Sequence, residues 1–143
     1  MTDISTNITD VEKRELLFRY RVIAVVGLSD SPWKPSQGVA EYMQDAGYLI
    51  VPVNPNRIGK TILGEMVYET LADIPFPVEI VDVFRPALVT PKIAEQAVAM
   101  GAKVLWLQQG IINEEAARIA RDGGLIVVMD RCIATDHARL IGS

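Results

Sequence analysis

Apolar residues are distributed along the chain in two alternating patterns. Five short runs, rich in β-branched residues, are apolar apart from Glu79, Asp82 and Lys103: residues 22–26, 48–53, 78–84, 103–107 and 125–129. Continuous runs of this length are typical of strands that are buried on both faces, as in a parallel sheet. The pattern therefore predicts five buried strands.

Helical spacing of apolar residues separates most of these runs. Helices are expected over residues 10–20 after a Thr9–Glu12 capping box, from an N-cap at Ser36 to Gly47, from an N-cap at Thr90 to Gly101, and from Asn113 to Gly123, with a short one over residues 68–71. Alternating strands and helices predict an α/β fold, a Rossmann-like, doubly wound parallel sheet of about five strands. We expect strand order 3-2-1-4-5, with the first and fourth strands adjacent where the order reverses.

Composition narrows the class of protein. At 143 residues the chain fits one domain, residues 1–143, with residues 1–20 as a leading segment and helix. The net charge of −4 argues against nucleic-acid and anionic-membrane partners. A single cysteine, Cys132, cannot form an internal disulfide, and a single histidine, His137, argues against a zinc site. The apolar runs are too short to span a membrane. We expect a cytoplasmic protein.

The loop after the first strand is the strongest candidate for chemistry. Gly27 lets backbone approach a ligand, Ser29 supplies a hydroxyl, Lys34 supplies a charge, and Ser36 opens a helix whose N-terminus favours anions. These residues predict a phosphate-binding loop. The alternative is a turn glycine, a solvated lysine and a serine that serves only as a cap.

Two familiar nucleotide motifs are incomplete. Ser29 and Pro32 stand where the dinucleotide fingerprint has glycines, and Asn54 stands where NAD enzymes carry an acid. NADP stays open, because Arg57 or Lys60 could meet a 2′-phosphate. The Gly59-Lys60-Thr61 triplet lacks the first glycine of a P-loop, so no ATPase is expected.

The remaining strand ends carry no obvious catalytic group. Asp82, inside an apolar run, is expected to be hydrogen-bonded near a strand end, and Trp106 is expected in the core. The neutral Gln108-Gln109-Gly110 turn suits amide or hydroxyl groups of a ligand. Because no nucleophile adjoins a base, we expect no enzyme.

Taken together, the strand-end motifs resemble one family over nearly the whole chain. The carriers are Val25-Val-Gly-Leu-Ser29 with Lys34-Pro-Ser36, Val51-Pro-Val-Asn-Pro55, Tyr68 with Leu71-Ala-Asp-Ile-Pro75, Asp82-Val-Phe-Arg85, Trp106-Leu-Gln-Gln-Gly110 and Met129-Asp-Arg-Cys132. In this order they resemble the CoA-binding domain family, which includes the N-terminal part of the succinyl-CoA synthetase alpha subunit. The small stand-alone bacterial members look most similar.

The resemblance implies binding of coenzyme A or a short acyl-CoA. The implied site is Gly27, Ser29, Lys34 and Ser36 for the phosphates, Val53, Asn54 and Pro55 for the adenosine, Val83, Phe84 and Arg85 for the nucleotide and the start of the pantetheine arm, and Gln109 and Gly110 for the pantetheine amides. Lys34 would serve the 3′-phosphate, and Cys132 would lie at the thiol end of the ligand.

The resemblance does not carry over ligase activity. The synthetase has a further domain with a phosphorylatable histidine, and His137 in the tail is not expected to be that residue. A small NADP-binding reductase or sensor is the alternative function. A partner subunit that completes the site, or a homo-oligomer, also stays open.

Overall fold

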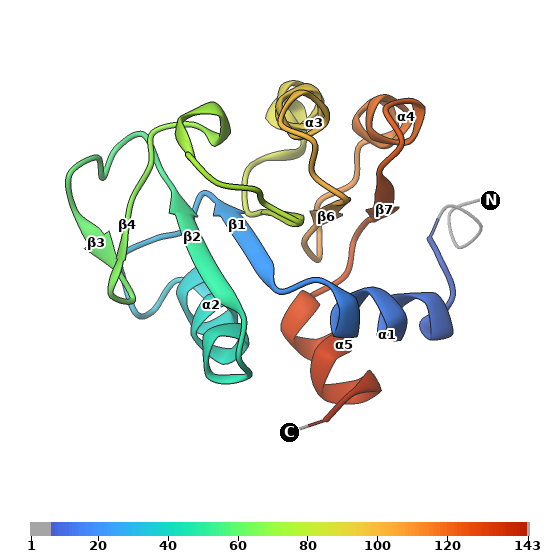
Figure 1. Ribbon diagram of the computed structural model, residues 1–143, viewed down its shortest axis with the longest axis horizontal. Coiled ribbons are helices and arrows are strands. Elements are labelled where there is room, and N and C mark those ends of the chain that lie inside the picture. The colour runs from blue at the N-terminus through green and yellow to red at the C-terminus, as the bar shows by residue number, and fades with distance from the viewer. Residues whose placement is uncertain (1–6, 143) are drawn as a thin grey trace.

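The centre of the molecule is a five-stranded parallel sheet (Figure 1). In the computed structural model, which describes residues 7–142, its strands are β1 (Val22–Val26), β2 (Leu49–Val53), β5 (Ile80–Val83), β6 (Val104–Leu107) and β7 (Ile126–Val128). All five predicted runs are strands, four of them shorter than predicted by one or two residues at an end. The predicted Rossmann-like α/β fold is confirmed.

The order of the strands is β2-β1-β5-β6-β7. In the numbering of the five predicted strands this is 2-1-3-4-5, so the third strand lies beside β1 and not outside β2. The place outside β2 is held by Tyr68, which pairs with Val53 in a single parallel bridge. When Tyr68 is counted as the third strand position, the order reads 3-2-1-4-5-6, and its first five positions follow the predicted order. Since β1 lies between β2 and β5, the order reverses between β1 and β5.

Helices cover both faces of the sheet (Figure 1). On one face α3 (Thr90–Ala99) and α4 (Glu114–Asp122) pack over Ala24, Val81 and Leu105. On the other, α1 (Asp10–Arg19), α2 (Pro35–Asp45) and α5 (Ile133–Leu140) pack over alternate strand residues, including Trp106. Trp106 is fully buried, as predicted.

Two helices begin differently from the prediction. The capping box at α1 and the Asn113 cap of α4 are confirmed. Ser36, however, lies inside α2, which begins at Pro35 with the Lys34 backbone as its N-cap. Thr90 likewise lies inside α3, and its hydroxyl donates to Ala87 O at 2.7 Å. In both cases a proline fits the first turn, where no backbone N–H is needed, and this moves the helix start.

Several short elements were not predicted. The connection between β2 and β5 contains the hairpin β3 (Thr61–Ile62) and β4 (Glu65–Met66), then the 3-10 turn η2 (Leu71–Asp73) where a helix over residues 68–71 was expected. A second 3-10 turn, η3 (Ala87–Val89), precedes α3. The sequence prediction also stopped short of α5, placing His137 in a tail.

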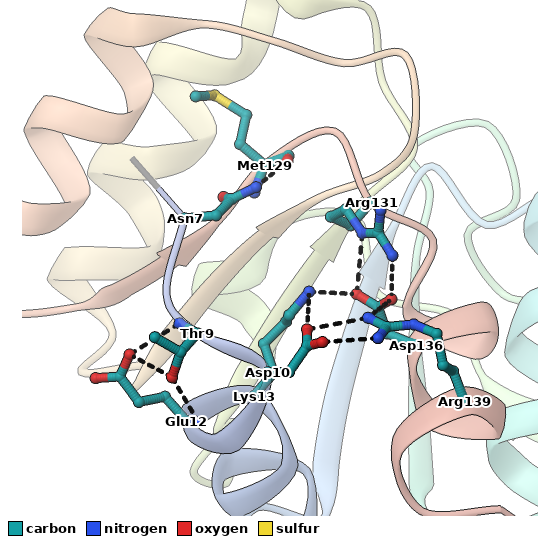
Figure 2. A network of polar contacts seen from close by, with 9 residues as sticks. All are labelled: Asn7, Thr9, Asp10, Glu12, Lys13, Met129, Arg131, Asp136 and Arg139. Carbon is teal, nitrogen blue, oxygen red and sulfur yellow. Dashed lines mark hydrogen bonds and ion pairs between the residues drawn. The ribbon is translucent and has the colours of Figure 1, made fainter. Parts of the chain in front are cut away.

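A cluster of ion pairs connects α5 with α1 (Figure 2). The fully buried carboxylate of Asp136 is 3.0 Å from Lys13 Nζ, 2.6 Å from Arg131 Nη2 and 3.0 Å from Arg139 Nη2. Arg139 also pairs with Asp10 of α1 at 2.8 Å. The first and last helices are therefore joined through two carboxylates, the buried Asp136 and the more exposed Asp10.

The outer edge of β7 is met by a side chain (Figure 2). The Asn7 amide nitrogen donates to Met129 O at 2.9 Å, and Met129 N–H donates to Asn7 Oδ1 at 2.8 Å. A side-chain amide thus supplies the hydrogen bonds that a neighbouring strand would make.

Across residues 7–142, no helix has the length and apolar character needed to span a bilayer.

Candidate functional site

The carboxyl ends of β1, β2 and β5 meet at Gly27. Its N–H donates to Val53 O at 2.9 Å, and its φ is +89°. A Cβ at this position would lie 2.5 Å from Phe84 O and 2.9 Å from Arg85 Cδ. Only glycine fits both the positive φ and this close approach. Four of the predicted residues are therefore brought together where the strand order reverses.

The β1–α2 loop is held by its own polar groups. Ser29 N–H donates to the buried Ser36 Oγ at 3.0 Å, and Ser29 Oγ accepts from Ser31 N–H at 3.0 Å. Asn54 Nδ2 reaches across from the end of β2 to Leu28 O at 2.9 Å. The predicted residues Ser29, Ser36 and Asn54 thus fix the shape of the loop. Lys34 lies exposed at the N-cap of α2.

A cleft of about 230 Å³ opens beside this loop, between the ends of β1 and β2, η2 and α3. Its apolar lining includes Val26, Val53, Leu71 and Ile93, whereas Pro55, Glu69, Thr70, Arg85, Lys92 and Gln96 are its other principal lining residues. Of the predicted site, Val53, Pro55 and Arg85 line it. An apolar cavity with a few convergent polar groups is the usual form of a small-molecule site.

The sequence prediction missed the α3 side of the cleft. Lys92 and Ile93 follow Thr90-Pro91 in the first turn of α3, directly after the loop that leaves β5. Pro91, at the start of the helix, indicates that Lys92 lies close to the carboxyl end of β5. The predicted strand order placed β5 outside β2, so Lys92 was not expected near Gly27.

Three cations at this edge carry no internal counter-charge. Within residues 7–142, the side chains of Lys34, Arg85 and Lys92 form no ion pair with a carboxylate. Arg57, by contrast, is paired with Asp30 at 2.8 Å. Arg57, one of the two residues that could meet an NADP 2′-phosphate, thus already has a carboxylate partner in this exposed ion pair. The unpaired cations favour an anionic ligand between the β1–α2 loop and α3.

A buried acid lies beneath the site. Asp82 in β5 is 1% exposed, and Gln108 Nε2 donates to its Oδ1 at 2.5 Å. Burial raises the pKa of Asp82 to about 7, against the lowering effect of the Gln108 hydrogen bond. The predicted hydrogen bond near the strand end is confirmed. Asp82 is buried below the surface that a ligand would touch.

Other predicted residues stand apart. Gln109 and Gly110 are exposed at the end of β6, two strands or roughly 10 Å from β1. Gly110 N–H donates to Asp130 Oδ1 at 2.7 Å. Val83 is fully buried below Phe84, and the partly exposed Cys132 is the N-cap of α5. The predicted residues thus span the ends of four neighbouring strands.

Comparison with known proteins identifies the family. The family model described as "CoA binding domain" matches residues 21–138. The chain belongs to the CoA-binding domain family. This confirms the family resemblance of the strand-end motifs, and the matched region contains every predicted binding residue.

Close relatives of similar length exist. The "Uncharacterized protein YneT" of Bacillus subtilis is 44% identical over 132 residues, covering 92% of this chain and 96% of that protein. A solved structure of a "hypothetical protein from Pyrococcus horikoshii OT3" has 39% identity and a TM-score of 0.91, covering 99% of each chain. A Thermus thermophilus structure, "cell-free ID.343", has 35% identity and a TM-score of 0.90 over 94% of this chain and all of that one.

A more distant relative is an enzyme of much greater length. The "Acetate--CoA ligase [ADP-forming] II" of Archaeoglobus fulgidus is 28% identical over 104 residues, or 71% of this chain and 15% of the ligase. Most of the ligase therefore lies outside the matched region. The homology supports a CoA-binding domain and does not extend to the rest of that enzyme.

Proposed function

We propose that the chain binds coenzyme A or a short acyl-CoA along the carboxyl edge of β2, β1, β5 and β6, without ligase catalysis of its own. The observation that carries the proposal is the cleft beside Gly27, with unpaired cations around it, in a member of the CoA-binding domain family. Ligands of open α/β sheets bind outside the carboxyl ends of the strands at the reversal of strand order.

The proposed ligand position follows the geometry of the edge. The adenosine would lie against Val53 and Pro55 in the cleft, and Asn54 would support the loop beside it. The phosphates would lie between Gly27 and the start of α2, where Ser29 and Ser36 shape the backbone. Backbone N–H groups at a helix N-terminus favour phosphate, and Lys34 adds a full charge there.

The pantetheine arm would leave the cleft across β5. Phe84 and Arg85 flank the path above the buried Val83, and Gln109 and Gly110 lie further along the same edge. Within residues 7–142 the Gln109 side-chain amide forms no hydrogen bond, which leaves it available to the pantetheine amides, whereas the Gly110 N–H is already bonded to Asp130. We therefore assign Gly110 a backbone role in the turn and Gln109 the polar contact.

Titration calorimetry with coenzyme A and dephospho-CoA tests the proposal. Lys34→Ala is expected to weaken coenzyme A about tenfold, or ~1.4 kcal/mol, and to weaken dephospho-CoA much less, because only coenzyme A carries the 3′-phosphate. Lys103→Ala, at the exposed amino end of β6, is the matched control and should change neither affinity.

Two results would contradict the proposal at different levels. No heat with coenzyme A or acetyl-CoA, at low salt and high protein concentration, would remove the function itself. Equal weakening of both ligands by Lys34→Ala would remove only the assignment of Lys34. NADPH fluorescence, run on the same samples, would reveal an NADP site in place of a CoA site.

A further inference from the structure

A second cavity lies at the opposite edge of the sheet. It has a volume of about 340 Å³, and its lining includes Arg21, Tyr42, Asp45, Tyr48, His137 and Ile141. Arg21 and Tyr48 stand just before β1 and β2, at their amino ends, whereas the candidate CoA site lies at their carboxyl ends. Strands of five residues separate the two edges by roughly 16 Å. The cavity is therefore separate from the CoA site.

A buried histidine lines this cavity with one ring nitrogen unused. His137 is 4% exposed, and its Nδ1 lies 3.0 Å from the Tyr42 hydroxyl. No hydrogen bond to its Nε2 is formed by any residue that the structure describes. Buried polar groups are almost always paired, so this nitrogen needs a partner beyond the described residues, which either a water molecule or a bound ligand can supply.

Two aromatic rings pack against His137 in the cavity lining. Tyr42 and Tyr48 both meet His137 edge to face, with ring centroids 5.5 and 5.6 Å away. The Tyr48 hydroxyl donates to Leu17 O, so its ring is fixed in place. Aromatic rings held in this way offer apolar and edge-to-face contacts to a planar ligand.

A cation at the rim lacks a carboxylate partner. The Arg21 guanidinium lies 4.8 Å from the centre of the Tyr48 ring, and within the described part of the chain it forms no ion pair. Glu79 bonds the Arg21 backbone N–H at 2.7 Å. Arginine over an aromatic face suits bidentate pairing with a carboxylate. Asp45, also in the lining, disfavours ligands that carry more than one negative charge.

We propose that this cavity binds a small monocarboxylate with an aromatic body. The carboxylate pairs with Arg21, the ring packs against the partly exposed Tyr42, and the ligand lies beside His137. The Asp45 carboxylate in the lining disfavours phosphate esters such as coenzyme A, which carry several negative charges. The proposal stands independently of the function assigned to the carboxyl edge.

Protein NMR with 3-phenylpropanoate and its neutral amide, 3-phenylpropanamide, tests this site. The carboxylate is expected to bind at least tenfold tighter than the amide, with shifts at the backbone of Ala46 and Gly142, which also line the cavity. Because the chain has one histidine, its ring signals report binding without ambiguity.

Variants of Arg21 separate the charge from the shape of the cavity. Arg21→Gln should reduce the preference for the carboxylate to near unity, and Arg21→Lys should keep part of it. Arg118→Gln, on the exposed surface of α4, is the control and should change nothing. Equal binding of the two probes, an unchanged preference in Arg21→Gln, no binding at millimolar concentration, or shifts confined to residues 27–36 would each overturn the proposal. The probe pair on the unaltered protein gives this answer even if a variant fails to fold.

Discussion

At Gly27 the backbone itself shapes the candidate site. Gly27→Ala is expected to lower the free energy of unfolding by roughly 3 kcal/mol, because a Cβ would combine a strained φ of +89° with a 2.5 Å approach to Phe84 O. Urea denaturation measures the change. The same variant should also lose coenzyme A affinity, since the loop would have to move.

A second glycine gives the matched control. Gly38 lies in α2, and a Cβ there would meet nothing within 4 Å. Gly38→Ala should therefore leave the fold intact and raise its stability by up to about 1 kcal/mol, the usual gain in a helix interior. If the two variants were equally stable, the close packing of Gly27 against β5 would be wrong.

Asp82 makes stability depend on pH in an unusual direction. Its pKa is about 7 in the folded chain against the ordinary aspartate value of 3.8, so between these values the folded state keeps a proton that the unfolded state has lost. Stability from this residue is complete below pH 3.8 and is lost as the pH rises through about 7. At ~1.4 kcal/mol per pH unit, the loss reaches roughly 4 kcal/mol.

Asp82→Asn is expected to remove this dependence. Its stability relative to the unaltered protein should rise steadily between pH 4 and pH 8, as measured by urea denaturation at each pH. Acids with lowered pKa, such as Asp10 and Asp136, titrate in both proteins and cancel in the difference. A difference that stays constant with pH would show that Asp82 is ionised at neutral pH.

The sequence predicted where the candidate residues lie in the fold better than it predicted which groups their side chains contact. Gly27, Arg85 and Val53 lie where the sequence prediction needs them, because the ends of buried parallel strands meet at one edge. Ser36 and Asn54 are in the right loops but bond to the protein. The sequence shows that a hydroxyl or amide is present but not whether it bonds to a ligand or to the backbone, because either can complete its hydrogen bonds.

Among the elements, α5 is one that the spacing of hydrophobic residues does not predict. Its buried face includes Ile133 but also Asp136 and His137, so the polar residues hide its helical spacing. The strands, in contrast, were predicted well because their residues are buried on both faces. The two-residue strands β3 and β4 are too short to carry a period at all.

The packing of α5 against α1 is stabilised mainly by the buried Asp136 carboxylate. Burial raises the pKa of Asp136, but hydrogen bonds from Arg131, Arg139 and Lys13 outweigh it and hold the pKa below its usual value. Asp136→Asn should cost about 3 kcal/mol at neutral pH, because it leaves the buried Lys13 ammonium without its closest charge.

The pH dependence of that cost gives a check. Asp136 stabilises the fold above its unfolded pKa, and the contribution disappears as the pH falls through the lower folded value. The cost of Asp136→Asn should therefore shrink on acidification in urea denaturation. Glu95→Gln, on the exposed surface of α3, should show no such trend. A cost that is the same at all pH values would contradict the ion cluster.

At the scale of the whole molecule, the sequence predicted the layers and not the order of the strands. Each apolar run shows that a strand is buried, but nothing in it says on which side of β1 the chain returns after β2. The long connection through β3, β4 and η2 passes Tyr68 along the outside of β2 before entering β5. A strand order of 2-1-3-4-5 still leaves a reversal beside β1, so the predicted location of the site survives.

Binding at that reversal should stabilise the entire fold. Coenzyme A at a hundred times its Kd adds about 2.7 kcal/mol, which for a chain of this size raises Tm by roughly 5–10 °C. Differential scanning fluorimetry measures the shift. NADPH at the same concentration should leave Tm unchanged, and a larger shift with NADPH than with coenzyme A would favour the reductase alternative.

The hydrogen bonds of Asn7 and Tyr68 have a consequence for how the protein behaves in a crowded solution. Parallel sheets end in strands whose free N–H and C=O groups invite pairing with another chain. Here Tyr68 occupies part of one margin, beside β2, and Asn7 occupies part of the other, beyond β7. Asn7→Ala would remove both hydrogen bonds to the backbone of Met129 and open a route to aggregation through sheet extension.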